Sequence, residues 1–256
     1  MDSKNQESMF DKLFNSGKTL FEDISKKVRQ SDFFKQGTCY ICGKPLIGIY
    51  YKDLYGRKIC TSHQRRTCIS CGGFCNDSAM EISPGKYLCS HCQHYRTSLA
   101  DAKHIIKLIR KHYLSIGLGE ISRFHLEMVG LEDLQRLMQT SGDILGCAKM
   151  TGRRFDIEVL RHLSHTAMAG VLAHEILHIW QYQRGIFPPQ DVCEGFCNLG
   201  SYELYKTIAS PHAKAKIEGL DMDPNPIYGD GYRKIKRYYD KEGWSGVIRK
   251  MEGYVQ

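Results

Sequence analysis

The sequence predicts an α+β protein in which a small cysteine-rich module precedes a larger domain with a small sheet and a pair of helices. Two observations lead to this fold class. Cysteine and histidine pairs recur at one fixed spacing between residues 39 and 92. Further along the chain, helical and strand-like stretches alternate, and one helical stretch carries two histidines among apolar residues. We therefore divide the chain into segments 1–36, 37–95 and 96–256.

The composition is that of a globular chain. Of the 256 residues, 42% are hydrophobic and 25% are charged, which excludes a disordered chain. No apolar run reaches the roughly 18 residues of a membrane span. The start, "MDSKNQESMFDKLF", lacks the apolar stretch of a secretory signal. We therefore expect a cytoplasmic protein, in which clustered cysteines indicate metal binding rather than disulfides.

The segment 1–36 has the pattern of one or two amphipathic helical stretches, broken near Gly17. Seven apolar residues recur there at near-helical spacing: Phe10, Leu13, Phe14, Leu20, Phe21, Ile24 and Val28. We expect this segment to pack on the body of the protein, and a partner-binding or membrane-surface arm is the alternative.

Eight cysteine and histidine residues between 39 and 92 form two sets in register. The first set is Cys39, Cys42, Cys60 and His63, and the second, 29 positions later, is Cys68, Cys71, Cys89 and Cys92. A Cys-x2-Cys pair on a tight turn presents two thiolates to one ion, and a second pair returned by a hairpin completes a tetrahedron. We predict two structural zinc ions, each contributing on the order of 10 kcal/mol to folding. Cys75, His91 and His94 lie nearby and are alternative ligands.

Two zinc hairpins in tandem resemble a LIM domain. The usual LIM pattern has histidine and then cysteine in the second half of the first site, with two residues between the sites. Here Cys60 precedes His63, and four residues separate His63 from Cys68. The resemblance implies a protein-interaction module. A zinc finger on nucleic acid is the runner-up, but no recognition-helix pattern lies between the ligand pairs.

Helical and strand patterns follow this module. "LADAKHIIKLIRKHYLSIG" predicts a helix closed by Gly117, and "RFHLEMVG" and "DILGCAKM" predict strands. After a Thr-Gly turn, "RRFDIEVLRHLS" predicts an alternating strand. A helix then begins near Ser164 and runs to about Gln183, and another begins near Asp191 after a Pro-Pro pair.

The stretch "VLAHEILHIW" places His174 and His178 on one helix face, because positions i and i+4 are neighbours. The two imidazoles can therefore hold one zinc ion. Glu175 lies about 100° round the helix, where it reaches a water on that metal without being a ligand. An amphipathic helix with two incidental histidines is the alternative, and the apolar flanks, the preceding strand and a following acid favour the metal site.

A catalytic zinc keeps three protein ligands and one open position, so a third ligand is required. Glu194, near the start of the next predicted helix, is our prediction, with fifteen residues between it and His178, and Asp191 is the alternative. Cys193 and Cys197 are interpreted as core thiols. Glu203, further along the same helix, is expected to orient the ligands.

This arrangement predicts peptide-bond hydrolysis. Zinc lowers the pKa of water toward about 7, and Glu175 accepts the proton during attack on a peptide carbonyl and passes it to the leaving amine. Tyr202, Tyr228 and His165 are the candidate donors to the developing oxyanion. The strand "RRFDIEVL" is where we expect an extended substrate to add as an extra strand.

Three further stretches follow the tandem zinc module in order: "LAHEILHIW", "CEGFCN" and "PIYGDGYR". Over roughly residues 38–256 the chain resembles the LIM-domain zinc peptidases related to the plant organ-size regulators. The resemblance implies Glu175 as base and His174, His178 and Glu194 as ligands. It also implies a cytosolic endopeptidase acting on ubiquitin-pathway proteins. The ubiquitin-interacting helices of the plant members have no counterpart in this chain's first segment.

We therefore expect a zinc-dependent endopeptidase of the gluzincin type, with one catalytic and two structural zinc ions. Its LIM-like module would dock protein partners or restrain the active site. The alternative is a zinc-scaffolded interaction protein with an inactive or latent peptidase fold. A nucleic-acid binder comes third. The basic C-terminal stretch has seven Lys/Arg against three acids from residue 232 on, and a solvated helix face accounts for it.

Overall fold

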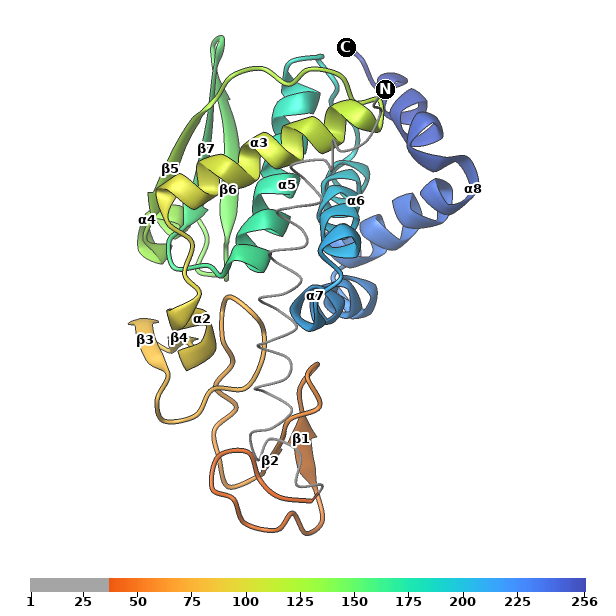
Figure 1. The fold of residues 1–256 in the computed structure, drawn as a ribbon. Helices are drawn as coiled ribbons and strands as arrows, with labels where there is room; N and C mark the ends of the chain where they lie inside the picture. Colours follow the sequence, from red (N-terminus) through yellow and green to blue (C-terminus); the bar gives the residue numbers. More distant parts are fainter. Residues whose placement is uncertain (1–36) are drawn as a thin grey trace, which may run out of the picture. The chain divides into compact units, whose positions relative to one another are not determined.

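The computed structural model describes residues 37–256, so the amphipathic segment expected at 1–36 lies outside the described residues. Chain contacts define two compact units, one ending at Gln64 and the other spanning Arg65–Gln256. The elements mix α and β structure, as predicted (Figure 1). The second hairpin shares its unit with the helices that follow it, whereas the first hairpin belongs to the other unit.

The two cysteine-rich hairpins have corresponding elements. In the first, β1 (Tyr50–Lys52) pairs antiparallel with β2 (Lys58–Cys60). In the second, β3 (Met80–Ser83) pairs antiparallel with β4 (Lys86–Leu88), and α2 (Ser90–His94) follows. The 29-residue repeat of the sequence is thus a repeat of structure.

Hydrogen bonds repeat at the same offset of 29 positions. The Cys39 N–H donates to Lys44 O (2.8 Å), and the Cys68 N–H donates to Gly73 O (2.9 Å). The turns close in the same way, with a glycine N–H donating to the carbonyl of the first cysteine in each hairpin. Those glycines, Gly43 and Gly72, have φ of 70° and 78°, a region open to glycine at little cost. The Cys-x2-Cys-Gly pattern therefore builds the same turn twice.

A three-stranded sheet lies in the larger unit. Its strands are β5 (His125–Val129), β6 (Gly146–Thr151) and β7 (Arg154–Leu160), in the order β5-β7-β6. β7 pairs with β5 in parallel and with β6 antiparallel. The expectation that a substrate adds to "RRFDIEVL" is therefore wrong, because this strand is central and both its edges are occupied. β6 is the edge strand that contacts the helix α5 (His165–Tyr182).

Helices make up the rest of the larger unit. In order they are α3 (Leu99–Ser115), α4 (Leu131–Leu137), α5 (His165–Tyr182), α6 (Gln190–Ile208), α7 (Pro211–Met222), the π-helix η1 (Pro226–Asp230) and α8 (Gly231–Glu252). The predicted helices α3, α5 and α6 lie where the sequence placed them. Ser98 and Asp101 form a capping box on α3, and Ser164 caps α5.

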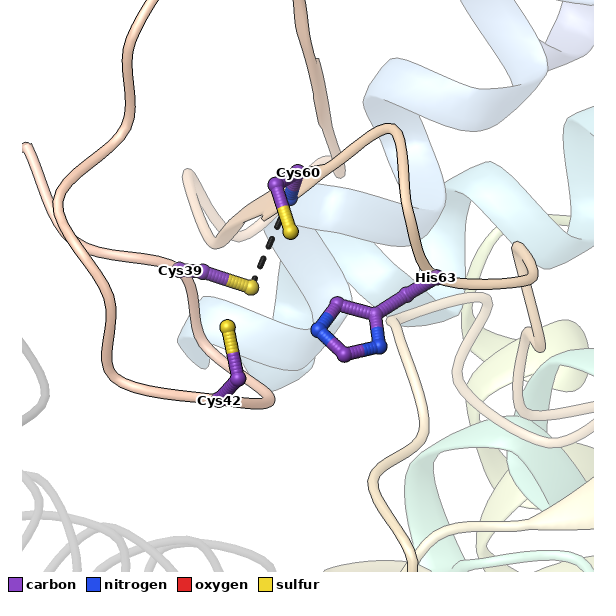
Figure 2. A group of neighbouring side chains, drawn as sticks. All are labelled: Cys39, Cys42, Cys60 and His63. Carbon is purple, nitrogen blue, oxygen red and sulfur yellow. Dashed lines mark hydrogen bonds between the residues drawn. The ribbon is translucent and has the colours of Figure 1, made fainter.

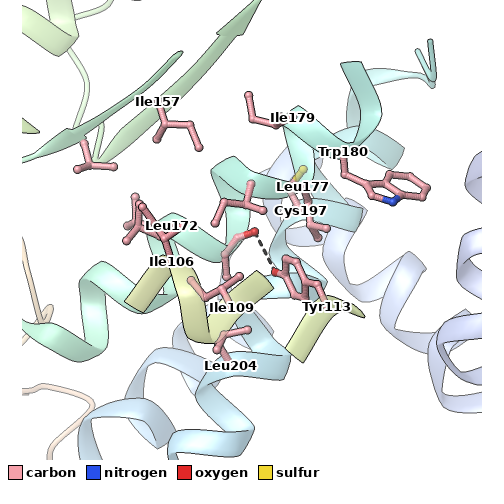
Figure 3. Close-up of a cluster of buried hydrophobic side chains, with 14 of the residues drawn as sticks. Ile106, Ile109, Tyr113, Ile157, Leu172, Leu177, Ile179, Trp180, Cys197 and Leu204 are labelled. Atoms are coloured by element: carbon pink, nitrogen blue, oxygen red, sulfur yellow. Dashed lines mark hydrogen bonds between the residues drawn. The ribbon is translucent and has the colours of Figure 1, made fainter. Parts of the chain in front are cut away.

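The core of the larger unit surrounds α5, fifteen of whose 18 residues are buried (Figure 3). Tyr113 of α3 donates a 2.9 Å hydrogen bond to the Ala173 carbonyl, and the Trp180 indole donates one of 2.7 Å to the Leu118 carbonyl. A Cβ at Gly170 would overlap the Tyr205 hydroxyl, so α5 and α6 approach closely there. α5 is therefore held rigidly along its length.

None of the helices that the structure describes is long and apolar enough to cross a membrane.

Candidate metal centres and active site

The first ligand set converges as predicted. One ligand atom each from Cys39, Cys42, Cys60 and His63 lies within 4.8 Å of all the others. Figure 2 shows the three sulfurs and the imidazole around a common point. The Cys60 N–H donates to the Cys39 sulfur at 3.4 Å. Burial alone would raise the pKa of Cys39, but the backbone N–H groups of Cys42 and Cys60 lower it to about 6. The lowered pKa favours the metal-binding thiolate.

The second ligand set, Cys68, Cys71, Cys89 and Cys92, also converges within 4.8 Å, and all four side chains are buried. The sulfurs of Cys71 and Cys89 are 3.8 Å apart. Four Zn–S bonds of about 2.3 Å in a tetrahedron require sulfurs about 3.8 Å apart, so the spacing fits a zinc ion. The described residues therefore contain two cysteine-rich sets that could each hold a metal ion.

The alternative ligands lie beside these sets. Cys75 is buried and interacts with Cys68, but it does not belong to the converging group. His91 and His94 instead pack their rings against Tyr95, with ring centroids 4.8 Å apart in each case.

A third set lies between α5 and α6. The Nε2 atoms of His174 and His178 are 3.2 Å apart, and Glu194 Oε2 lies 3.1 Å from the first and 3.7 Å from the second. Ligands about 2.05 Å from a tetrahedral zinc are about 3.3 Å apart, so these three atoms fit one face of a zinc site. Asp191, the alternative ligand, instead binds Lys234 Nζ at 2.9 Å.

The charges of Glu194 and His178 in this third set are coupled. Burial alone would raise the pKa of Glu194, but the two imidazoles hold it well below its usual range. Burial alone would lower the pKa of His178, but Cys193 and the carboxylates Glu194 and Glu175 raise it to about 10. The carboxylate of Glu194 and the imidazole of His178 therefore stabilise each other's charged forms.

Asn198 orients the His174 ring. Its amide nitrogen donates to the Tyr228 carbonyl at 3.1 Å, so its Oδ1 faces His174 Nδ1 at 3.0 Å. Nδ1 must then carry the proton, which leaves the Nε2 lone pair directed at Glu194 and His178. Asn198 lies one turn after Glu194 on α6, a signal that sequence reasoning missed.

Cys193 and Cys197, which the sequence analysis interprets as core thiols, both contact His178. Its Nδ1 lies 3.5 Å from the Cys197 sulfur and 3.7 Å from the Cys193 sulfur. Gln181 Nε2 donates to Cys197 at 3.2 Å, which helps to fix that sulfur. Both thiols also fall into possible ligand groups with His178.

Glu175 lies beneath the edge strand β6. Its side chain is buried, and burial raises the pKa of its carboxyl group. A Cβ built on Gly146 would lie 2.8 Å from Glu175 Oε1 and 2.7 Å from Val171 Cγ1. The absence of a side chain at Gly146 thus lets β6 pass directly against the carboxylate.

The three candidate oxyanion donors lie in different places. Tyr228, in η1, interacts with Glu194 and Glu175, and burial raises its pKa to about 12 while 40% of the residue stays exposed. Tyr202 packs instead among tyrosines and lies under the Lys236 ammonium. His165, at the first residue of α5, pairs with Asp101 at 3.6 Å. Only Tyr228 among these candidates adjoins the third set.

Glu203 does not orient the ligands, contrary to expectation. Its Oε2 accepts a 3.1 Å hydrogen bond from the Tyr239 hydroxyl, and the same carboxylate pairs with Lys206 and His112. It lies nine residues after Glu194 on α6, which places it more than two turns from the ligand.

No family model, curated protein or solved structure matches the chain.

Proposed function

We propose that the protein is a zinc-dependent endopeptidase whose active site is the His174, His178 and Glu194 set with Glu175 beside it. The observation that carries this proposal is the spacing of 3.1–3.7 Å among three ligand atoms from two helices. Three protein ligands leave one position open, which distinguishes a catalytic from a structural zinc site.

The residues around the set have separate tasks in this proposal. Zinc, when bound, supplies Lewis-acid activation of water and of the peptide carbonyl. Glu175 accepts a proton from the attacking water and delivers it to the leaving nitrogen, a role suited to a carboxyl group whose pKa is raised by burial. Tyr228 donates a hydrogen bond to the developing oxyanion.

The substrate in this proposal is an extended protein segment. β6 has one edge paired with β7 and contacts α5 with its residues near Glu175. A peptide that adds to the other edge of β6 forms main-chain hydrogen bonds and runs past the candidate base. The edge strand therefore replaces β7 as the expected docking strand.

The two cysteine-rich hairpins form a LIM-like module with two structural zinc ions in this proposal. On the first hairpin Ile47 and Ile49 are 92% and 81% exposed, which suits the docking of a protein partner. Ubiquitin-pathway substrates and a cytoplasmic location follow from the family resemblance. The convergence of eight cysteine and histidine ligands supports a reducing compartment.

The test compares wild type with Glu175→Gln and with His174→Ala/His178→Ala. We expect about three zinc ions per chain in wild type and in Glu175→Gln, and about two in the double variant. Peptidase activity on an unfolded protein substrate should fall about a thousandfold or more in Glu175→Gln. Full activity in that variant would contradict the assignment of Glu175 as the base.

A latent peptidase is the second candidate, and one observation favours it. Glu175 is only 6% exposed beneath β6, so a substrate reaches it only when that strand or η1 moves. Three zinc ions per chain with activity only after a partner or proteolysis acts would support latency. Two zinc ions in both wild type and the double histidine variant would favour a purely structural scaffold.

A further inference from the structure

The turn between the first two ligands of the second set contacts the start of the active-site helix. Ser70 lies between Cys68 and Cys71 and is completely buried. Its hydroxyl accepts a 2.9 Å hydrogen bond from the Ser164 N–H and donates one of 3.1 Å to the Ser164 hydroxyl. Ser164 is the N-cap of α5, so a metal-binding turn touches the residue from which that helix begins.

Contacts after the last ligand of the second set reach the same place. Arg96 forms an antiparallel bridge with Ser164, and the Thr97 N–H donates a 2.9 Å hydrogen bond to the Leu163 carbonyl. Ile69, next to Ser70, packs against the core around α5. The chain is therefore attached to the start of α5 both within the second set and just beyond it.

Ser70 accepts a hydrogen bond from the backbone N–H of Ser164, a donor for which the N-cap has no acceptor of its own. Ser164 uses its hydroxyl to accept from the Ala167 N–H and its carbonyl to accept from the Met168 N–H. Its own N–H is buried and takes Ser70 Oγ as acceptor. A buried N–H without an acceptor is costly, so the position of Ser70 affects the geometry of the first turn.

α5 transmits that position to the third set. His174 lies ten residues after Ser164, which corresponds to about 15 Å along a helix. The helix between them is buried on all sides, so it moves as a rigid body. A shift at its N-terminus therefore becomes a shift of the two histidines relative to Glu194 on α6.

The metal does not require a serine at this position. Ile41, between Cys39 and Cys42, occupies the position 29 residues before Ser70. The first set converges equally well with isoleucine there. The hydroxyl of Ser70 therefore serves the contact with α5 and not the metal-binding turn.

We propose that Ser70 is a positioning residue that couples metal occupancy of the four-cysteine set to the geometry of the third set through the N-cap of α5. Loss of the metal would remove the four-ligand constraint that holds the Cys68–Cys71 turn in place. The last step, from the helix to catalysis, rests on the proposed function; the step from the four-cysteine set to α5 does not.

The first experiment measures hydrogen exchange and zinc binding in the full chain with Ser70→Ala. The control is Ser78→Ala, which removes an exposed hydroxyl from the same hairpin. We expect Ser70→Ala to keep the four-cysteine metal, to exchange amides 164–168 about tenfold faster, and to lose zinc from the third set at a lower chelator concentration. Equal behaviour of the two variants would overturn the proposal.

The second experiment uses the wild-type chain and is independent of how the variants fold. A chelator removes zinc, and a thiol reagent reports when the four buried cysteines become reactive. We expect exchange of amides 164–168 to rise in step with thiol reactivity. Continued protection of these amides after the thiols react would overturn the proposal. Absence of peptidase activity would count against the proposed function and leave both exchange results standing.

Discussion

The two cysteine-rich hairpins share a ligand pattern, a turn and a strand pair, and they differ in the burial of their ligands and in the contacts around them. In the first set Cys42 is exposed and Cys60 and His63 are half-buried, whereas all four cysteines of the second set are buried. The first hairpin belongs to a unit that ends at Gln64, and the second belongs to the unit with the helices. The ligand spacing thus determines the local turn, and the residues between the ligands determine what the hairpin attaches to.

Residues at equivalent positions make the difference specific. The exposed Ile47 and Ile49 of the first hairpin correspond, 29 positions later, to Asn76 and Ser78. The first hairpin thus carries apolar side chains on an exposed loop where the second carries polar ones. Under the proposed function, the apolar loop of the first hairpin serves docking, and the contact of the second hairpin with α5 supports the helical unit.

The largest expected effect comes from removing equivalent ligands, Cys42 and Cys71. Cys71→Ser should destabilise the helical unit by up to about 10 kcal/mol, which approaches the whole stability of a domain. Cys42→Ser should change the stability of that unit by less than about 0.5 kcal/mol. Thermal unfolding followed by helical circular dichroism measures this, because every helix in the described part of the chain lies beyond Gln64. Equal losses in the two variants would break the comparison.

A smaller effect is expected at the third set, which is built on helices instead of hairpin turns. Asn198→Ala should weaken zinc binding there about 10- to 100-fold, because His174 Nδ1 loses its acceptor and the ring is free to rotate. Asn198→Asp, which keeps an acceptor, is the matched control and should retain more of the affinity. Competition with a chelator measures it. Unchanged zinc affinity in Asn198→Ala would show that the ring is fixed by packing alone.

The acid sensitivity of the helical unit is expected to be smaller still. His212 on α7 interacts with Cys68, and burial lowers its pKa to about 3. The unfolded chain, with a histidine pKa near 6.5, therefore binds one more proton between these values, and stability falls as the pH drops below about 6.5. Between pH 7.5 and 6.0 the contribution of His212 to the free energy of unfolding should fall by roughly 1 kcal/mol, measured in urea unfolding as the difference between wild type and His212→Gln. His212→Gln should lose less stability than wild type over that interval. An identical pH dependence in the two proteins would show that His212 does not cause the acid sensitivity.

The sequence predicted the parts that rest on local patterns. The repeat of Cys-x2-Cys pairs specified both cysteine-rich sets, and the i, i+4 histidines with the following acid specified the third. Ser164 as the cap and the Pro-Pro pair specified the bounds of α5 and the start of α6. In each case the information lies within one or two turns of the chain.

The rest depends on contacts between distant residues. The order of the three strands placed the strand before α5 in the centre, since a parallel partner came from β5. The packing of α6 on α5 brought Cys193 and Cys197 to His178, and it carried Glu203 away from the ligands. Helical spacing alone does not reveal which side of a helix a neighbouring element will cover.

The smallest effect on stability, and the sharpest on docking, is expected from copying the second hairpin's loop onto the first. Ile47→Asn with Ile49→Ser should change the stability of the chain by less than about 0.5 kcal/mol, because both isoleucines are more than four-fifths exposed. The same variant should lose a partner that cross-links to the first hairpin of the wild-type chain in cells, since an exposed apolar surface of this kind favours protein contact. The converse variant, Asn76→Ile with Ser78→Ile, should not acquire that partner, because the second hairpin already contacts α5 through Ser70. Cross-linking of the partner with equal yield in both variants would contradict the docking role of the first hairpin. The two hairpins would then differ only in the contact with α5.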